Sequence, residues 1–361
     1  MSAPVPKKIR VLIVDDSAVI RMLLTKILGA DPEFEIVGTA PDPYVARELL
    51  ISLRPDVMTL DVEMPRMDGV TFLEKVMAHF PTRTIIISSL TVEGAETSLR
   101  ALEAGAIDVM PKPAIDITRA MTQIRQEIIT RVKAVARAKL TSVRPLFNSP
   151  SSTLKRKSIA TTALPKTSHQ ILAIASSTGG TEAIKVVLGG LSGEIPGVVI
   201  VQHMPPIFTA TFAATLQRMF PYFEVREAGH GDRVFPGRIL IAPGDYHMQL
   251  ARSGAQYEVR LNQDPPMHFV RPAADILLKS VAVNAGSNAI GLVLTGMGKD
   301  GAEGLKAMKE AGSYNIAQDE ASCSVFGMPK EAIEIGAIDV VLPLKEIAGG
   351  ILKRLKIRSA A

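Results

Sequence analysis

Polar residues that could do chemistry follow a series of apolar runs in the first third of the sequence. Asp15 and Asp16 come directly after VLIV, Asp61 follows VMTL, Ser88 ends TIIIS and Lys112 follows DVMP. If these runs are parallel strands, their carboxyl ends meet at one edge of a sheet. Three clustered carboxylates favour a hard cation such as Mg²⁺. A carboxylate beside such a cation can attack a phosphoryl group and become an acyl phosphate.

Taken alone, each of these residues also has a plainer explanation. Asp16 and Ser17 could be an ordinary pair at a helix N-cap, and Asp68-Gly69 could be a simple turn. The order of the whole set, with each member at a strand end, favours the chemical interpretation.

The stretch ILAIASSTGGTEA (171–183) places two serines and two glycines between an apolar run and a helical pattern. Three interpretations are open: a phosphate cradle, a turn that presents a nucleophile, and a plain strand-to-helix turn. Phosphate binding is disfavoured because the next lysine, Lys185, lies well inside the helix and because the two glycines are adjacent, unlike those of nucleotide-binding fingerprints. Ser177 is the candidate nucleophile and Ser176 its alternative.

A nucleophilic serine needs a base, and imidazole is the usual base near neutral pH. Of the six histidines, His203 alone ends a strongly apolar run, VVIVQH. Asp300 follows the run IGLVLTG and is modestly preferred to Asp245 as the partner that orients the imidazole. Glycine-rich turns at 179–180 and 296–298 could supply backbone N–H donors to an oxyanion.

Strands that alternate with helices must position these residues, which predicts two α/β units with parallel sheets. In the first unit the strands are expected at 9–16, 34–40, 56–61, 84–89 and 106–112, with helices such as 18–28 and 69–80. In the second they are expected at 171–176, 197–203, 238–243, 290–296 and 339–343, with helices at 181–190, 206–219, 271–285, 300–311 and 329–335. Gly29 is expected to take the left-handed conformation at a helix C-terminus.

The segment between the two units has a different composition. Residues 140–168 are rich in Ser, Thr and Pro and predict a flexible linker after a basic helix at about 117–139. The sequence GAIDV occurs at 105–109 and again at 336–340. In both places a helix is expected to end in glycine and a strand to begin, so we interpret the match as two similar turns and not as a repeat.

The composition is that of an ordinary globular protein: 361 residues, 47% hydrophobic and 21% charged, long enough for two domains. The single cysteine, Cys323, excludes an intramolecular disulfide framework. The start of the sequence does not resemble a signal peptide, and no apolar stretch approaches the ~20 residues of a membrane helix. A cytoplasmic protein is therefore expected.

The net charge of +5 is concentrated in one region. Residues 119–166 hold eleven Lys or Arg and one acid, which leaves the remainder of the chain net negative. A solvated basic helix and linker is the simpler explanation, and docking to an acidic partner or a nucleic acid is the alternative.

Residues 9–128 resemble a two-component response-regulator receiver domain through VDDS, LDVEMPRMDG, ISSLT and DVMPKP. The resemblance implies a (βα)5, flavodoxin-like fold. The site residues that it implies are Asp61 as phosphoacceptor, Asp15, Asp16, Asp61 and the backbone carbonyl of Glu63 as Mg²⁺ ligands, and Ser88 and Lys112 as sensors of the phosphoryl group. Val109 stands where the family often has an aromatic switch residue, which puts a rotating-ring relay in doubt.

Residues 169–358 resemble the catalytic domain of the chemotaxis protein-glutamate methylesterases (the CheB family). The matching runs are ASSTGGTEAI, VQHMPPIFT, IAPGDYHM, VLTGMGKDGA and IAQDEASCSVFGMPKEAI. The resemblance implies a doubly wound, mostly parallel α/β domain. It also implies the site residues Ser177 as nucleophile, His203 as base, Asp300 as its orienting partner, and Thr178, Gly179 and Met297 near the oxyanion.

Together the two resemblances imply a phosphorylation-regulated hydrolase that demethylates glutamate methyl esters on chemoreceptors and deamidates glutamines. They imply a chemotaxis histidine kinase as phosphodonor and no cofactor for ester hydrolysis. The protein would lie at receptor arrays without membrane insertion, and no nucleic-acid partner is expected. The expected boundaries are 9–128 for the receiver, 129–168 for the helix end and linker, and 169–358 for the catalytic domain. The alternatives are a receiver-gated regulator without enzymatic activity and a serine esterase for small soluble esters.

Overall fold

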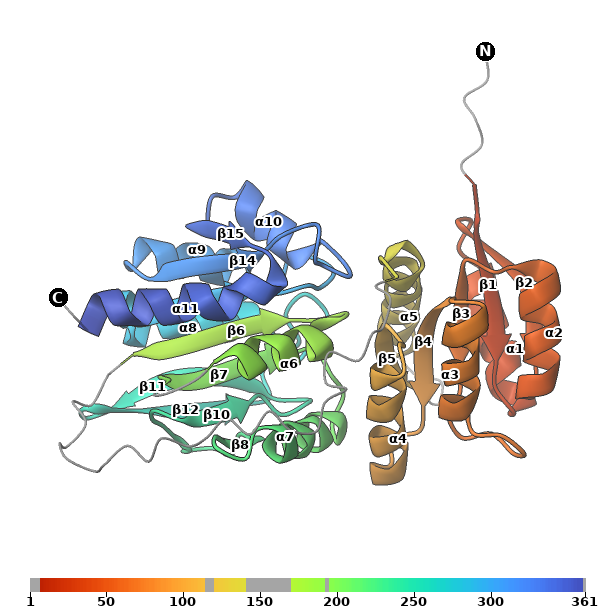
Figure 1. Cartoon of the computed structure of the whole chain (residues 1–361), viewed down its shortest axis with the longest axis horizontal. Coiled ribbons are helices and arrows are strands. Elements are labelled where there is room, and N and C mark those ends of the chain that lie inside the picture. Colours follow the sequence, from red (N-terminus) through yellow and green to blue (C-terminus); the bar gives the residue numbers. More distant parts are fainter. Residues whose placement is uncertain (1–6, 114–119, 141–169, 192–194, 360–361) are drawn as a thin grey trace, which may run out of the picture.

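A computed structural model describes residues 7–113, 120–140, 170–191 and 195–359. Residues 141–168 of the predicted linker lie outside this described part. The described residues form two α/β domains that lie side by side, with the N-terminal domain coloured red to yellow in Figure 1.

The N-terminal domain is built on a five-stranded parallel sheet in the order β2-β1-β3-β4-β5. This is the order of flavodoxin-like folds, so the predicted fold is confirmed. Its elements are β1 (Ile9–Val14), α1 (Ala18–Gly29), β2 (Phe34–Ala40), α2 (Pro43–Leu53), β3 (Val57–Leu60), α3 (Gly69–His79), β4 (Arg83–Ser88), α4 (Val92–Glu103), β5 (Asp108–Pro111) and α5 (Ala120–Arg137).

Local side chains fix where the helices of this domain begin. The side chains of Ser17, Asp42, Asp68 and Thr91 each accept a hydrogen bond from a backbone N–H in the first turn of α1 to α4. The expectation for Gly29 is wrong, because it stays within α1 and the helix ends on Ala30 at an ordinary φ of −81°. A C-cap without a left-handed residue needs no glycine.

Helix α5 packs into the core of the N-terminal domain from Ile124 onward. Ile128, Val132 and Val135 pack in one cluster with α1 and the neighbouring strands, and α5 therefore continues past residue 128. Its cations have partners within the domain: Lys133 Nζ lies 2.8 Å from Asp31 Oδ2. Other pairs on this helix are Lys133–Glu33, Arg137–Glu33, Arg131–Asp108 and Arg131–Glu127. Much of the basic character of α5 is thus neutralised within the chain.

The C-terminal domain contains a seven-stranded parallel sheet in the order β15-β14-β13-β6-β7-β10-β8. Its strands are β6 (Ile171–Ser176), β7 (Gly197–Gln202), β8 (Glu224–Glu227), β10 (Arg238–Ile241), β13 (Ala289–Val293), β14 (Tyr314–Gln318) and β15 (Val340–Leu342). One face is covered by α6 (Gly180–Gly190), α7 (Phe208–Met219) and α11 (Leu344–Ser359). The other is covered by α8 (Ala274–Asn284), α9 (Ala302–Glu310) and α10 (Met328–Glu334). The doubly wound prediction is confirmed.

A second, three-stranded antiparallel sheet in this domain is not anticipated by the sequence analysis. It contains β9 (Arg233–Val234), β11 (His247–Ser253) and β12 (Gln256–Asn262) in the order β11-β12-β9. It packs with α8 over one face of the large sheet. The loop from β12 to α8 leads from this small sheet back to the large one.

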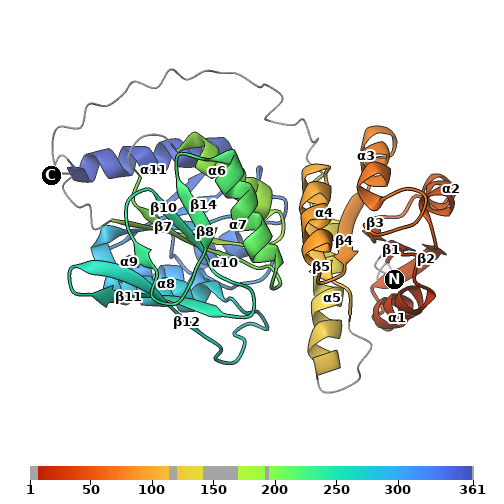
Figure 2. The ribbon, with the colours of Figure 1, turned by 90° about the horizontal axis from the view of Figure 1, so that it is seen from below.

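The two domains meet through α4, β5 and α5 of the N-terminal domain, which lie toward the C-terminal domain in both views (Figures 1 and 2). Helix α4 contacts α6 and α7. Lys185 in α6 is buried and its Nζ lies 2.9 Å from Glu103 Oε1 in α4. The receiver therefore covers the edge of the large sheet where its strands end.

Candidate active site and phosphorylation site

The turn between β6 and α6 is held by its own glycines and by neighbouring strands. Gly179 has a φ of 76°, which favours glycine, and a Cβ on Gly180 would lie 2.3 Å from Gln202 Oε1. The Ser177 N–H donates to the Thr295 carbonyl at 3.1 Å, and Gln202 Nε2 donates to the Ser177 carbonyl at 2.9 Å. These contacts fix the backbone on which Ser177 stands.

The two serines of the turn have different surroundings. Ser176 is fully buried and its Oγ donates to Gln202 Oε1 at 2.7 Å. Ser177 lines a cavity of about 160 Å³ together with His203, Asp300 and Met297. The structure therefore assigns a packing role to Ser176 and places Ser177 at a cavity.

Three strand ends bring the predicted catalytic residues into this cavity. Ser177 follows β6, His203 follows β7, and Asp300 lies in the loop after β13, the three adjacent central strands of the sheet. His203 Nε2 and Asp300 Oδ2 are 2.8 Å apart and both side chains are buried. The His203 nitrogen that remains to act as a base is therefore Nδ1.

The carboxylate of Asp300 accepts hydrogen bonds from the first backbone N–H groups of α8, which favour its ionised form. Its Oδ2 also accepts from the Ala274 N–H at 2.6 Å, and its Oδ1 accepts from the Asp275 N–H at 2.9 Å. Burial acts to raise the pKa of Asp300, but the interaction with His203 and these two backbone bonds outweigh it and lower the pKa below 3.8. A carboxylate that stays charged can stabilise an imidazolium beside it.

The competing residue Asp245 is excluded from this role by its partners. Its carboxylate forms an ion pair with Arg271, and Gln263 Nε2 donates to its Oδ2 at 3.2 Å. His247 is fully buried, and its ring bonds the Pro265 carbonyl and the Ala273 N–H, both at 3.2 Å. Burial lowers the pKa of His247, so this ring is neutral and anchors the loop before α8.

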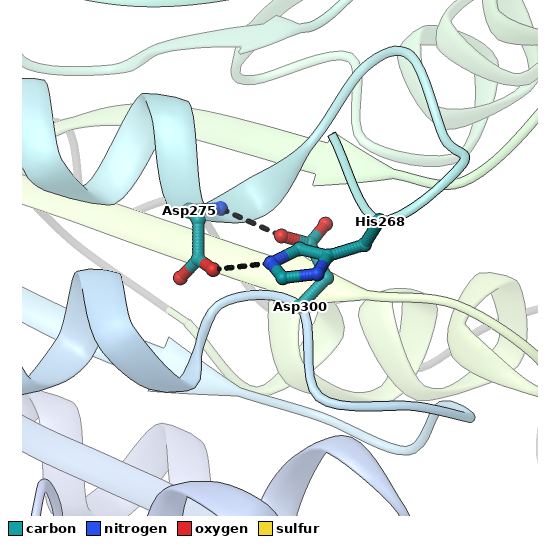
Figure 3. Close-up of side chains that lie close together, drawn as sticks. All are labelled: His268, Asp275 and Asp300. Carbon is teal, nitrogen blue, oxygen red and sulfur yellow. Dashed lines mark hydrogen bonds and ion pairs between the residues drawn. The ribbon is translucent and has the colours of Figure 1, made fainter. Parts of the chain in front are cut away.

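His268 also lines the catalytic cavity, a position that the sequence analysis missed. Its Nε2 lies 2.8 Å from Asp275 Oδ2, and the Asp275 N–H bonds Asp300, as Figure 3 shows. The sequence holds no local signal for this contact, because His268 lies in a polar, Pro-rich loop whose path depends on the small sheet.

The group His268, Asp275 and Asp300 has the residue types of a metal site, with candidate ligand atoms within 4.8 Å of one another. All four carboxylate oxygens already accept hydrogen bonds, since Asp275 Oδ1 accepts from the Gly304 N–H at 2.7 Å and its Oδ2 faces His268. We therefore interpret this group as a hydrogen-bond network.

The predicted oxyanion residues divide into two sets. Thr178 and Met297 line the cavity with Ser177. The Gly179 N–H instead donates to the carbonyl of Ile107 in the receiver, at 3.2 Å. In this arrangement Gly179 belongs to the interdomain contact, while Thr178 and Met297 line the cavity beside Ser177.

The receiver brings its predicted acidic residues together at the ends of β1 and β3. The carboxylates of Asp15, Asp16 and Asp61 offer oxygens within 4.8 Å of one another. Lys112 Nζ lies 2.8 Å from Asp61 Oδ2 and 3.2 Å from Asp15 Oδ2. Asp15 Oδ2 is buried and faces Lys112 without a well-aligned hydrogen bond, so a hard cation with oxygen ligands fits this site.

The remaining receiver residues surround this cluster. Ser88 is fully buried at the end of β4, where its Oγ donates to the Gly94 carbonyl at 3.4 Å. The Glu63 N–H donates to Asp61 Oδ1 at 3.1 Å. Val109, in place of an aromatic switch residue, is buried in β5.

Burial dominates the titration of the acidic cluster. It raises the pKa of Asp61 to about 6, although Lys112 opposes the shift, and it also raises the pKa of Asp15. Burial acts to lower the pKa of Lys112, but Asp61 and Asp15 outweigh it and the pKa is raised. The lysine is therefore charged and compensates part of the acidic charge.

Receiver residues close one side of the catalytic cavity. Its lining includes Gln126, Glu127, Thr130 and Arg131 of α5. Beside the nucleophile, Thr178 Oγ1 donates to Asp108 Oδ2 of β5 at 2.7 Å, and both residues are buried. Just after the end of α5, the Lys139 N–H donates to the Ser324 carbonyl at 3.1 Å. The two functional sites are thus joined through β5 and α5.

The fold and these sites define a response-regulator receiver joined to an α/β domain with a Ser-His-Asp constellation. The chain matches the family models described as CheB methylesterase over residues 172–351 and response regulator receiver domain over residues 11–125. It therefore belongs to the CheB methylesterase family.

Individual relatives agree with this assignment. The chain is 60% identical over 355 residues to the protein-glutamate methylesterase/protein-glutamine glutaminase of Bdellovibrio bacteriovorus, which covers 98% of this chain and 99% of that protein. It is 51% identical to protein-glutamate methylesterase/protein-glutamine glutaminase 2 of Pseudomonas aeruginosa, over 96% of this chain and 97% of that protein. The crystal structure of the Thermotoga maritima CheB methylesterase catalytic domain is 39% identical with a TM-score of 0.50, over 51% of this chain and 97% of that one.

None of the described helices is long and apolar enough to span a bilayer.

Proposed function

We propose that this protein hydrolyses glutamate γ-methyl esters on chemoreceptors, in the cytoplasm, and that it also deamidates glutamines on the same receptors. The observation that carries the proposal is that Ser177, His203 and Asp300 line one and the same cavity, in a domain that follows a receiver domain in the chain. The names of the relatives support both activities.

In the first step Ser177 Oγ attacks the ester carbonyl carbon while His203 Nδ1 takes the serine proton. The negative charge that develops on the carbonyl oxygen is stabilised by backbone N–H donors near Thr178 and Met297. Asp300, kept ionised, stabilises the imidazolium that has formed. The protonated ring then gives its proton to the departing methanol, and an acyl-enzyme remains.

In the second step water attacks the acyl-enzyme. His203 takes a proton from the water and returns it to Ser177 Oγ as the acyl bond breaks, which leaves a glutamate carboxylate on the receptor. A glutamine side chain enters the same sequence with ammonia as the leaving group. Neither reaction needs a cofactor.

The receiver is proposed to be phosphorylated at Asp61 by a chemotaxis histidine kinase. Mg²⁺ would be held by Asp15, Asp16, Asp61 and the Glu63 carbonyl, and it would neutralise charge on the transferred phosphoryl group. Lys112 is charged and lies beside Asp61, and Ser88 lies at the end of the neighbouring strand, so both are in place to sense the modification.

Phosphorylation is proposed to shift an equilibrium between this docked arrangement and an open one. The modification adds up to about two negative charges at a site connected to the interface through β5. Deleting residues 1–140 removes the elements that close the cavity, so we expect the basal esterase rate to rise. A rate that stays unchanged or falls, from a folded catalytic domain, would contradict inhibition by the receiver.

Methanol release from membranes that contain methylated receptors tests the catalytic assignment. Ser177→Ala is expected to abolish it. Turnover of small soluble esters alone, with none of methylated receptor, would instead favour a general serine esterase.

A further inference from the structure

An exposed aromatic ring stands at the rim of the catalytic cavity and takes no part in the chemistry. Phe269 lines the cavity with Ser177 and His203, yet 74% of its surface is exposed even with the receiver docked. A large apolar side chain in this position gives little to folding, because it is not removed from water. Its place beside the nucleophile points to a binding role.

The backbone that presents this ring is strained. His268 and Phe269 have φ values of 53° and 65°, the left-handed region that bulky residues rarely adopt. They form the centre of a tight turn in which Met267 and Val270 exchange backbone hydrogen bonds of 3.2 and 3.0 Å. Such turns normally place glycine, asparagine or aspartate at these two positions. Strain of this kind persists only where the surrounding structure enforces it.

His268 supplies that enforcement. Its Nε2 is bound to Asp275 Oδ2 at 2.8 Å, and Asp275 is fixed in turn by the Gly304 N–H and by its own N–H to Asp300 (Figure 3). The turn is therefore tied through one buried carboxylate to the residue that orients the catalytic base. The backbone that carries Phe269 is thereby fixed at the rim of the cavity that Ser177 lines.

The same rim already accommodates a helix. Gln126, Glu127, Thr130 and Arg131, which line the cavity opposite the turn, lie on successive turns of α5. In an open state without the receiver contact, the space that α5 occupies beside Phe269 would have the dimensions of a helix.

We propose that Phe269 is a substrate-docking residue that packs against the apolar face of the receptor helix carrying the glutamate methyl ester, with His268 and Asp275 as its positioning residues. The proposal rests on the proposed function, since it names a surface by which that enzyme would bind its substrate. The ring contributes binding energy outside the reacting atoms and places the ester carbonyl near Ser177.

The test compares Phe269→Ala with the native full-length chain on methylated receptor membranes, in the presence of Mg²⁺ and acetyl phosphate. Alanine carries the same Cβ as phenylalanine, so the backbone strain is kept and only the ring is lost. The matched control is Phe80→Ala, which removes a half-exposed phenylalanine at the end of α3, outside the catalytic cavity.

We expect Phe269→Ala to raise KM for the receptor about tenfold with a small change in kcat, the effect of truncating one aromatic anchor at an interface. Phe80→Ala is expected to leave both constants unchanged, and Phe269→Leu to recover part of the loss. An unchanged KM, or a loss confined to kcat, would overturn the proposal. An unchanged KM together with a higher esterase rate of the unphosphorylated protein would also overturn it, because that result would assign the ring to the contact with the receiver. If the native chain releases no methanol, the proposed function itself fails.

Discussion

The hydrogen bond between Thr178 and Asp108 predicts that Asp108→Asn raises the esterase rate of the unphosphorylated protein. Asp108 Oδ2 accepts from Thr178 Oγ1 at 2.7 Å across the domain boundary. Its Oδ1 accepts from the Val109 N–H at 2.8 Å and lies 3.4 Å from Arg131 NH1. An asparagine keeps one neutral acceptor oxygen, and its NH₂ group replaces the oxygen that faces either Thr178 or the Val109 N–H.

The size of the effect follows from the change in acceptor charge. A hydrogen bond to a charged group is worth about 1.5–3 kcal/mol and a neutral one about 0.5–1.5 kcal/mol. The docked state therefore loses roughly 1 kcal/mol or somewhat more. Because each 1.4 kcal/mol is a factor of ten in an equilibrium, the open fraction rises about fivefold to tenfold when the docked state dominates.

The assay is steady-state methanol release without phosphodonor, with the same measurement after acetyl phosphate. We expect the unphosphorylated rate of Asp108→Asn to rise about fivefold to tenfold and the ratio of activated to basal rate to shrink accordingly. The matched control is Asp31→Asn, which removes the same charge from the ion pair with Lys133 inside the receiver and should not raise the basal rate. An unchanged or lower basal rate in a folded Asp108→Asn protein would refute the argument.

Two further substitutions test the catalytic and receiver sites separately. Asp300→Asn should lower kcat about 10³–10⁴-fold, because a neutral amide in place of the carboxylate no longer stabilises the imidazolium of His203; a loss below tenfold would contradict the assigned role of Asp300. Burial raises the pKa of Asp61 from 3.8 to about 6. The protonated side chain therefore contributes to the free energy of unfolding below pH 3.8, and this contribution is lost as the pH rises through 6. Asp61→Asn should therefore raise the melting temperature at pH 8 in EDTA, with a difference that vanishes toward pH 4. An equal melting temperature at pH 8 would show that Lys112 fully compensates the buried charge.

The sequence predicts where the strands end, because buried parallel strands leave a strong apolar signal. The apolar runs before Asp61, Ser177 and His203 are each buried strands, and the residue after such a run lies at the functional edge of the sheet. The GAIDV echo has a physical basis as well: Gly105 and Gly336 both have positive φ, 113° and 73°, and each precedes a strand at the edge of its sheet.

What the sequence leaves open depends on tertiary contacts. Asp245 and Asp300 are both candidates for the partner of His203 in the sequence. In the structure the N–H groups of Ala274 and Asp275 hold the Asp300 carboxylate, and no local sequence pattern reveals these contacts. The role of His268 follows from a loop that returns to the large sheet after an antiparallel hairpin. The bond from Thr178 to Asp108 joins residues 70 positions apart, so only the docked domains reveal it.

The most direct test of the catalytic assignment is the rate of methanol release from methylated receptor membranes by the native chain and by Ser177→Ala, each with acetyl phosphate. Ser52→Ala, which removes an exposed hydroxyl from α2, is the control for a serine outside the site. We expect the native chain and Ser52→Ala to release methanol at the same rate and Ser177→Ala to release none above background. Turnover by folded Ser177→Ala at the native rate would contradict the assignment of the nucleophile and, with it, the proposed mechanism.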